Sequence, residues 1–397
     1  MAKRQIKSPA EEIEELEEES KKTTVKKTPA QLEKLYDATS GRILQERNDF
    51  FLPQIAEFVD KKRLVNLQPE YQRRRRWDRR KQSKLIESLL MNVPVPPIFL
   101  YETDLSRYEV MDGQQRLVAI VNFYQGKLQL TKLKAWSDLN GLSYSDLPDR
   151  LKRGLDRRRI SAVILLAESA TPEGIEFADI RREVFERLNT GGTALNAQEL
   201  RNSIYGGPFN DLIVELTEEP LFCRMWQIPE HRRTPNKRER EALENNETYK
   251  QMIDCQIILR FFAFRERASI SGSIKSMLDN CMKRNRNLDL TKIKTARGDF
   301  LSRLTLVRDI FGQDAFRLPA SENNRHSRPL SDAIMIACDR LWRYRGDLIK
   351  NRSALRTKLA KLLAAPKSYA VIVGRPNTSK AILGRIRLVE NALKSVL

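Results

Sequence analysis

A short segment around residue 112 combines residue types that suit phosphate binding. Tyr108–Met111 has the composition of a strand and is followed by Asp112, Gly113, Gln114, Gln115 and Arg116. The glycine lets the backbone approach a ligand closely, and a helix that begins there directs N–H groups and positive dipole toward an anion. Arg116 in the first helical turn favours a nearby anion. Asp112 could hold a divalent metal ion beside phosphates or simply cap the helix in front of an exposed arginine, and both interpretations stay open.

A second feature is a run of basic residues in which six arginines and two lysines fall within residues 73–84. Arginine binds phosphate through two parallel hydrogen bonds, and Trp77 within the run could stack on a base or fill a core pocket. Two further basic clusters lie at 150–159 and 232–240. If they share one face, the three clusters form a nucleic-acid surface; the alternative is a solvated basic face. The candidate contacts are Arg74, Arg75, Arg76, Arg79, Arg80, Lys81, Arg157, Arg158, Arg159, Arg232 and Arg233.

A third feature is a glycine-containing corner between two expected helices. The first helix ends near Asn189, and Thr190, Gly191 and Gly192 follow it. Asn196 with Glu199 has the spacing of a capping box at the start of the second helix. The corner is either purely structural or a glycine loop whose backbone N–H groups cover a nucleotide.

The elements that position these residues mix helix and strand in the N-terminal half. The pattern predicts a short helix within 50–59 that begins near Pro53, an extended segment over 65–71, and a helix with Asp78 as its N-cap and apolar residues at 85–90. Strands are expected at 98–101, 108–111 and 162–166. From about residue 175 the apolar spacing becomes helical throughout, with core stripes at 252–262, 300–311, 330–341 and 382–396.

Composition narrows the classes of function. The formal charge of +20 and a pI near 9.8 favour a polyanionic partner. Residues 1–40 carry a net charge of about −1 in blocks typical of a disordered tail or a solvated helix. No apolar run is long enough to span a bilayer, and no secretory signal is visible, so a cytoplasmic location without membrane association is expected. Four scattered cysteines indicate buried thiols in a reducing compartment. Two histidines argue against histidine-based nucleases, and no Walker A motif is present.

The order of these motifs resembles the N-terminal domain of GmrSD-type modification-dependent restriction enzymes, which belong to the ParB/sulfiredoxin-like superfamily. The resemblance covers roughly residues 48–205 and rests mainly on the Asp112–Arg116 signature, with 71–77, 86–90, the prolines at 94–97 and the 187–192 loop in the same order. It implies an α+β chain. A charged, disordered tail over 1–45 would precede a ParB/sulfiredoxin-like nucleotide-binding domain over 46–205 and a mainly α-helical domain over 206–397.

The resemblance also implies an activity and a set of site residues. The expected function is an NTP-binding and NTP-hydrolysing, DNA-associated subunit of a prokaryotic, phage-restricting defence system, with Mg²⁺ or another divalent cation as cofactor. Asp112, Gln115 and Arg116 would be catalytic, and Asp112 would also hold the metal. Nucleotide would be bound by Gln72, Arg73, Gly113, Gln114, Asn189, Thr190, Gly191 and Gly192.

One departure limits this expectation. The two-part enzymes of the family carry a C-terminal nuclease domain containing histidine, whereas the C-terminal half here is helical and the whole chain has two histidines. A separately encoded nuclease would then be a partner, besides DNA, the nucleoside triphosphate and a possible second copy of the chain. The alternatives are a non-enzymatic DNA-binding protein of the same fold and a stand-alone, metal-dependent DNA nuclease.

Overall fold

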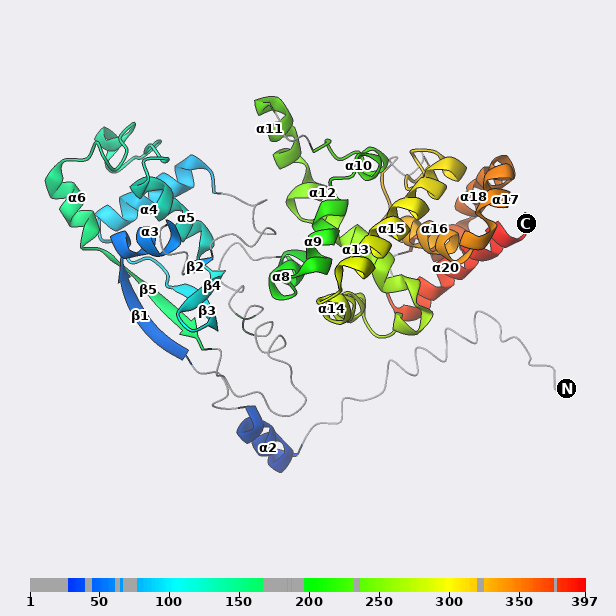
Figure 1. The fold of residues 1–397 in the computed structure, drawn as a ribbon, viewed down its shortest axis with the longest axis horizontal. Helices are drawn as coiled ribbons and strands as arrows, with labels where there is room; N and C mark the ends of the chain where they lie inside the picture. The colour runs from blue at the N-terminus through cyan, green and yellow to red at the C-terminus, as the bar shows by residue number, and fades with distance from the viewer. Residues whose placement is uncertain are drawn as a thin grey trace.

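The computed structural model describes residues 28–39, 45–60, 65–66, 77–166, 184, 187, 196–231, 236–319, 325–374 and 377–397. A small sheet with helices on one face forms the N-terminal part, and an all-helical region forms the C-terminal part (Figure 1). The chain is therefore α+β, as predicted, with a mainly helical C-terminal region.

The sheet is mixed and has five strands in the order β1-β5-β3-β4-β2. The strands are β1 (Gln45–Phe51), β2 (Val65–Asn66), β3 (Ile98–Asp104), β4 (Arg107–Asp112) and β5 (Arg159–Leu165). β1 pairs with β5, and β3 with β4, in antiparallel fashion, whereas β3 with β5, and β2 with β4, are parallel. The expected strands at 98–101, 108–111 and 162–166 are thereby confirmed, each slightly longer or shifted.

The helix predicted to begin near Pro53 within 50–59 is confirmed as α3 (Leu52–Asp60), but the first two residues of that range are in a strand. Phe50 and Phe51 belong to β1, where they pair with Ile160 and Arg159, and α3 (Leu52–Asp60) begins only after them. Pairing with a strand more than 100 residues away supplies the ladder hydrogen bonds that local spacing does not reveal. Of the extended segment expected at 65–71, Val65 and Asn66 form β2 and the rest lies outside the described residues.

Strands β3, β4 and β5 alternate between two hydrophobic cores. Ile98, Leu100 and Val110 face the first core, formed with α3, α4 (Arg79–Leu90), α5 (Gln114–Tyr124) and α6 (Asp149–Asp156). Their neighbours Phe99 and Met111 belong to the second core. This period-two alternation is the sheet geometry expected when both faces are covered. Figure 1 shows α3, α4 and α5 on one face of the sheet.

The second core is the interior of the helical region. Its helices are α8 (Ala197–Ile204), α9 (Pro208–Leu216), α10 (Pro220–Trp226), α11 (Lys237–Asn245), α12 (Glu247–Lys250), α13 (Ile253–Arg265), α14 (Ile274–Asn285), α15 (Leu290–Phe311), α16 (Arg328–Arg340), α17 (Arg345–Lys350), α18 (Arg352–Ala364), α19 (Pro366–Val373) and α20 (Ser379–Lys394). The four predicted apolar stripes lie on α13, α15, α16 and α20 and contribute to this core. Apart from Met111 and Leu165 on the sheet, the buried side chains of this core begin at Leu200, so α8 packs with the helical region.

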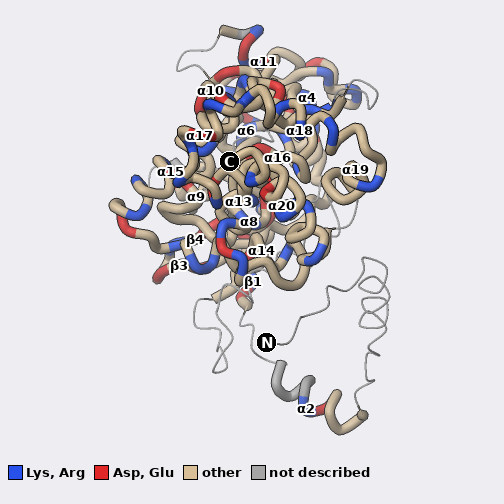
Figure 2. Tube along the Cα trace, turned by 90° about the vertical axis from the view of Figure 1, so that its right-hand side faces the viewer, with Lys and Arg blue, Asp and Glu red and all other residues tan. Residues whose placement is uncertain are grey.

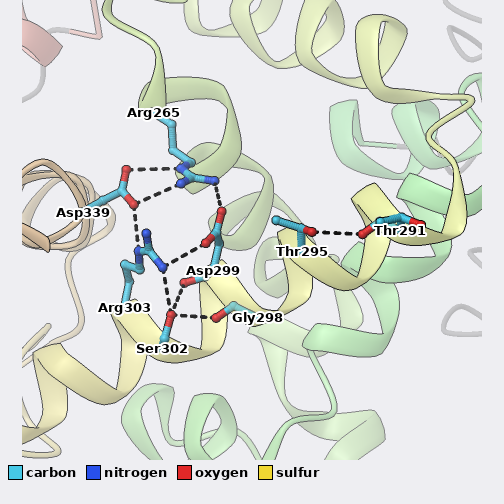
Figure 3. Close-up of polar contacts among 8 residues, drawn as sticks. All are labelled: Arg265, Thr291, Thr295, Gly298, Asp299, Ser302, Arg303 and Asp339. Carbon is cyan, nitrogen blue, oxygen red and sulfur yellow. Dashed lines mark hydrogen bonds and ion pairs between the residues drawn. The ribbon is translucent and has the colours of Figure 1, made fainter. Parts of the chain in front are cut away.

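Arginine–aspartate pairs join three of these helices (Figure 3). Arg265 on α13 binds both carboxylate oxygens of Asp339 on α16 at 3.2 Å and Asp299 on α15 at 2.8 Å. Arg303 on α15 contacts the same two carboxylates at 2.9 Å. Two guanidinium groups and two carboxylates thus form a closed, charge-balanced ring that needs no external anion.

The remaining expectations about the chain concern its tail and its thiols. Pro29–Thr39 form α2, and the described side chains of its first half are exposed, so this part of the 1–45 stretch is a solvated helix. All four cysteines are free and buried, as predicted. Among the residues that the structure describes, no helix is both long and apolar enough to cross a membrane.

Candidate functional site

The segment that the sequence singled out forms the turn between β4 and α5. β4 ends at Asp112, Gly113 adopts a left-handed conformation with φ of 93°, and α5 begins at Gln114. A Cβ atom at position 113 would lie 2.5 Å from the Ile98 Cγ2 atom. Both the backbone conformation and the contact with Ile98 therefore require glycine.

The interpretation of Asp112 as the N-cap is wrong. Gly113 is the N-cap of α5, and no side chain of that residue can accept a hydrogen bond from the first turn. The positive φ of the glycine turns the chain after Asp112, so the carboxylate points elsewhere. Because Gly113 has no side chain to accept from the backbone N–H groups of the first turn, the start of α5 keeps its electrostatic preference for an anion.

Arg116 is not exposed, so the interpretation of this turn as a capped helix with an exposed arginine is wrong in this respect as well. Its Nη2 atom donates to Asp112 Oδ2 at 2.8 Å and to the Pro97 carbonyl oxygen at 3.0 Å. Its side chain is 14% exposed, whereas that of Asp112 is 47% exposed. The Arg116 Nε–H group is buried and, within the described part of the chain, donates to no acceptor. The guanidinium thus joins α5 to the turn before β3 and retains one unsatisfied donor.

Gln115 connects the start of α5 to the start of α4. Its Oε1 atom accepts a hydrogen bond from the Trp77 backbone N–H at 2.8 Å. Further along the same two helices, Asn122 donates to Gln82 Oε1 at 3.3 Å. The first contact places the start of α4 beside the start of α5, and the second joins the beginning of α4 to the last turn of α5. Two positive helix ends therefore meet at the Trp77–Gln115 bond.

The predicted start of α4 is confirmed, and part of the arginine run lies on it. Asp78 is the N-cap, and its carboxylate accepts from the Lys81 N–H at 2.7 Å. Arg79, Arg80 and Lys81 occupy the first turn and are exposed. Their cationic heads thus extend from the helix end that adjoins Gln115.

Two of the three predicted contacts at 157–159 have packing partners of their own. Arg158 donates to the Leu90 carbonyl oxygen at 3.2 Å, which joins the end of α4 to the region before β5. The Arg159 guanidinium lies 4.3 Å from the centroid of the Phe51 ring. Arg157 is exposed. The nucleic-acid role of all three remains a prediction.

Several predicted site residues lie outside the described residues. They are Gln72, Arg73, Arg74, Arg75, Arg76, Asn189, Thr190, Gly191, Gly192, Arg232 and Arg233. The capping box that follows the glycine corner is confirmed, because Asn196 accepts from the Glu199 N–H and Glu199 accepts from the Asn196 N–H.

Sequence reasoning missed two contributors to this turn, the Pro97 carbonyl oxygen and the Ile98 side chain. The only signal for them was the proline-rich segment immediately before a strand, which does not indicate its contact with Arg116. Among the described residues, no group of three or more His, Cys, Asp and Glu side chains gathers as a metal site. Asp112 alone fits a Mg²⁺ ion that takes its other ligands from phosphates and water.

Comparison with known proteins identifies the N-terminal part of the chain. Residues 55–206 match the family model described as GmrSD restriction endonuclease, N-terminal domain. No curated protein and no solved structure matches the chain. The matched segment contains most of α3, the β4–α5 turn and α8, whose Leu200 and Ile204 belong to the helical core. Residues 55–206 are therefore similar to the N-terminal domain of GmrSD restriction endonucleases.

Proposed function

We propose that this chain is a nucleotide-binding and NTP-hydrolysing, DNA-associated subunit of a prokaryotic restriction system. The observation that carries the proposal is the start of α5 at Gly113, which its N-cap residue leaves uncapped while a buried guanidinium nitrogen of Arg116 has no partner among the described residues. Backbone N–H groups and an arginine at one helix end are the elements with which proteins bind phosphate.

Each residue of the turn has a role in this proposal. Gly113 permits the left-handed turn that begins α5 and keeps Ile98 and Arg116 in place, because a Cβ there would overlap both side chains. Arg116 compensates negative charge that develops on the phosphates during hydrolysis. Asp112, about half exposed, faces the solvent at the same turn and can bind a divalent cation. The cation, when bound, neutralises phosphate charge and orients the phosphate chain.

DNA association is supported by the charge around this turn. Arg79, Arg80 and Lys81 project from the helix start that Trp77 joins to Gln115. Within the described residues none of the three forms an ion pair, so their charge is available to a polyanion.

The test is a thermal-shift panel of nucleoside triphosphates, with and without Mg²⁺, on the wild type and on Arg116→Gln. Nucleotide should raise the melting temperature of the wild type, since a ligand that binds only the folded state stabilises it. Arg116→Gln should lose most of this shift and most of any phosphate release. Absence of a shift for every nucleotide in the wild type would refute the nucleotide-binding and hydrolysis part of the proposal.

A matched control separates ligand binding from stability. Arg303 forms a similar i,i+4 ion pair with Asp299 at 2.9 Å on α15, in the other core. Arg303→Gln should lower the melting temperature without changing the increment that nucleotide adds. Equal increments in Arg116→Gln and wild type would show that Arg116 serves only the fold.

A second candidate is a DNA-binding protein without enzymatic activity. The observation that favours it is the ion pair itself, because Asp112 already neutralises Arg116. In that case Asp112→Asn and Arg116→Gln would both lower stability, and neither would alter DNA affinity.

A further inference from the structure

The C-terminal helices hold more than half of the net charge of the chain. Residues 341–397 contain thirteen Lys and Arg against two Asp and Glu, a net charge of +11 of the total +20. This region lies beyond the family-matched segment, which ends at residue 206. Figure 2 looks onto the end of the molecule where α17, α18, α19 and α20 lie around the C-terminus.

Four cations on these helices are exposed to solvent. Arg352 and Lys361 on α18, Lys367 on α19 and Arg387 on α20 are exposed, and within the described residues none of them forms an ion pair. On α13 and α15, by contrast, Arg265 and its neighbours are neutralised by aspartates inside the fold (Figure 3). The helical region therefore compensates its interior arginines but not these four exposed cations.

The placement of the charges runs against the helix dipoles. The first turns of α18, α19 and α20 contain no acidic residue, and each contains a cation: Arg352, Lys367 and Lys380. Cations at the positive end of a helix are unfavourable unless an anion is close. Three successive helices that share this arrangement and pack on one another concentrate positive potential on their outer surface.

On α20 the charges form a line. Lys380, Arg387 and Lys394 are seven residues apart, on the side opposite the buried Ile386 and Val389. Seven residues advance an α-helix by about 10.5 Å, so the line is roughly 21 Å long. Lys394 is partly neutralised by Glu390 at 2.6 Å. A straight row of cations of this length suits a regular polyanion rather than a compact phosphate.

The neighbouring side chains favour a duplex over other polyanions. The outer side of α18 carries Ser353, Ala354, Thr357, Ala360 and Ala364, all exposed, and lacks the large apolar groups with which helices enter membranes. The Trp342 ring is covered by the guanidinium groups of Arg303 and Arg345, at 4.1 and 5.0 Å from its centroid. It therefore offers no open platform for the bases of a single strand.

We infer that the outer surface of α18, α19 and α20 binds the phosphate backbone of double-stranded DNA. The inference rests on the DNA association in the proposed function, to which it adds a second contact surface, and is independent of nucleotide binding. The contact is to phosphates and carries no sequence preference of its own.

The test uses the full chain and a fluorescent duplex of arbitrary sequence, with affinity measured by anisotropy over a range of salt concentrations. The variant Lys361→Gln/Lys367→Gln/Arg387→Gln removes three exposed cations. If each contacts a phosphate, the slope of log K against log salt should fall by about 2 to 3, and affinity near 0.1 M salt should fall roughly tenfold or more. The control Lys134→Gln/Arg267→Gln/Lys294→Gln removes the same charge from exposed positions elsewhere and should keep the wild-type slope.

Two outcomes overturn the inference: equal losses in both triple variants, or an unchanged slope in the C-terminal variant. The same holds if that variant binds DNA normally but no longer sediments with vesicles of phosphatidylcholine and phosphatidylglycerol, since the surface would then serve a membrane. The nucleotide thermal shift of the C-terminal variant should match the wild type. If the C-terminal variant shows a normal nucleotide thermal shift and an unchanged DNA slope, only this inference is refuted. If the wild type shows no nucleotide thermal shift, only the nucleotide site is refuted.

Discussion

Arg201 on α8 and Asp279 on α14 form a buried ion pair, with 2.6 Å between Nε and Oδ1 and side chains 4% and 6% exposed. The pair joins the last helix of the family-matched segment to the helical core across 78 residues of sequence. The end of the matched segment is thus not the end of a folding unit.

Removing one partner of this pair should destabilise the protein strongly. Asp279→Asn leaves the Arg201 guanidinium buried beside a neutral amide, and we expect a loss of about 3–5 kcal/mol in the free energy of unfolding. Urea titration would measure it. The double variant Arg201→Met/Asp279→Leu should recover much of the loss, because it leaves no uncompensated charge. A small effect of the single variant would show that water replaces the carboxylate.

Gly113→Ala should also destabilise the protein, by about 1–3 kcal/mol or more. The cost has two sources, the positive φ of the position and the overlap of the new Cβ with Ile98. Gly298→Ala on α15 is the control, since a Cβ there meets no atom within 4 Å. Alanine within that helix should instead stabilise by about 0.5–1 kcal/mol. Chemical denaturation of both variants compares them directly.

His326 should make stability depend on pH. Its ring stacks on Trp226 with centroids 5.4 Å apart. Burial lowers the pKa of His326, and the Arg317 guanidinium lowers it further, although Asp314 acts in the opposite direction. The unfolded chain, with a histidine pKa near 6.5, therefore takes up the proton before the folded chain does. The stabilising contribution is complete above about pH 6.5 and declines as the pH falls toward the folded pKa.

Unfolding by urea at several pH values between about 5 and 7.5 would show this slope. His326→Phe keeps an aromatic ring against Trp226 and removes the titrating group, so its stability should change less over the same interval. A slope as steep in the variant as in the wild type would assign the effect to other groups.

The native thiols should be chemically inert. Burial raises the pKa of Cys223 to about 11 and those of Cys281 and Cys338 to about 12, and Cys255 is also buried. Because the thiolate is the reactive form, a disulfide reagent such as DTNB should modify no cysteine of the folded protein and all four after denaturation. Rapid reaction of a thiol under native conditions would show that the helical core opens locally.

What could be predicted from the sequence was mostly local. The caps at Asp78 and Asn196 were predictable because a capping residue and its partner are only three positions apart. The apolar stripes of α13, α15, α16 and α20 were predictable for the same reason, since their period spans one or two turns. The existence and chain order of β3, β4 and β5 also followed from pattern.

What could not be predicted depends on residues that are distant in sequence. The contact of Arg116 with Pro97 and the bond between Trp77 and Gln115 join positions 19 and 38 residues apart. Asp112 was expected as a possible cap because aspartate commonly has that role, but the clash-free turn against Ile98 exists only with Gly113 in the left-handed region. The charge of the C-terminal helices was countable in the sequence, yet its exposure was not.

The hydrogen bond between Trp77 and Gln115 makes the two helix starts thermodynamically dependent on each other. A ligand that recruits the Gln115 amide must share or displace the Trp77 N–H, and this changes the freedom of the basic first turn of α4. By reciprocity, a polyanion held by Arg79 and Lys81 alters the affinity of the α5 start for its own ligand by the same factor. The factor is obtained by measuring the affinity for duplex DNA with and without nucleotide, in the wild type and in Gln115→Ala. Equal factors in the two proteins would show that the Trp77–Gln115 bond does not couple the two ligands.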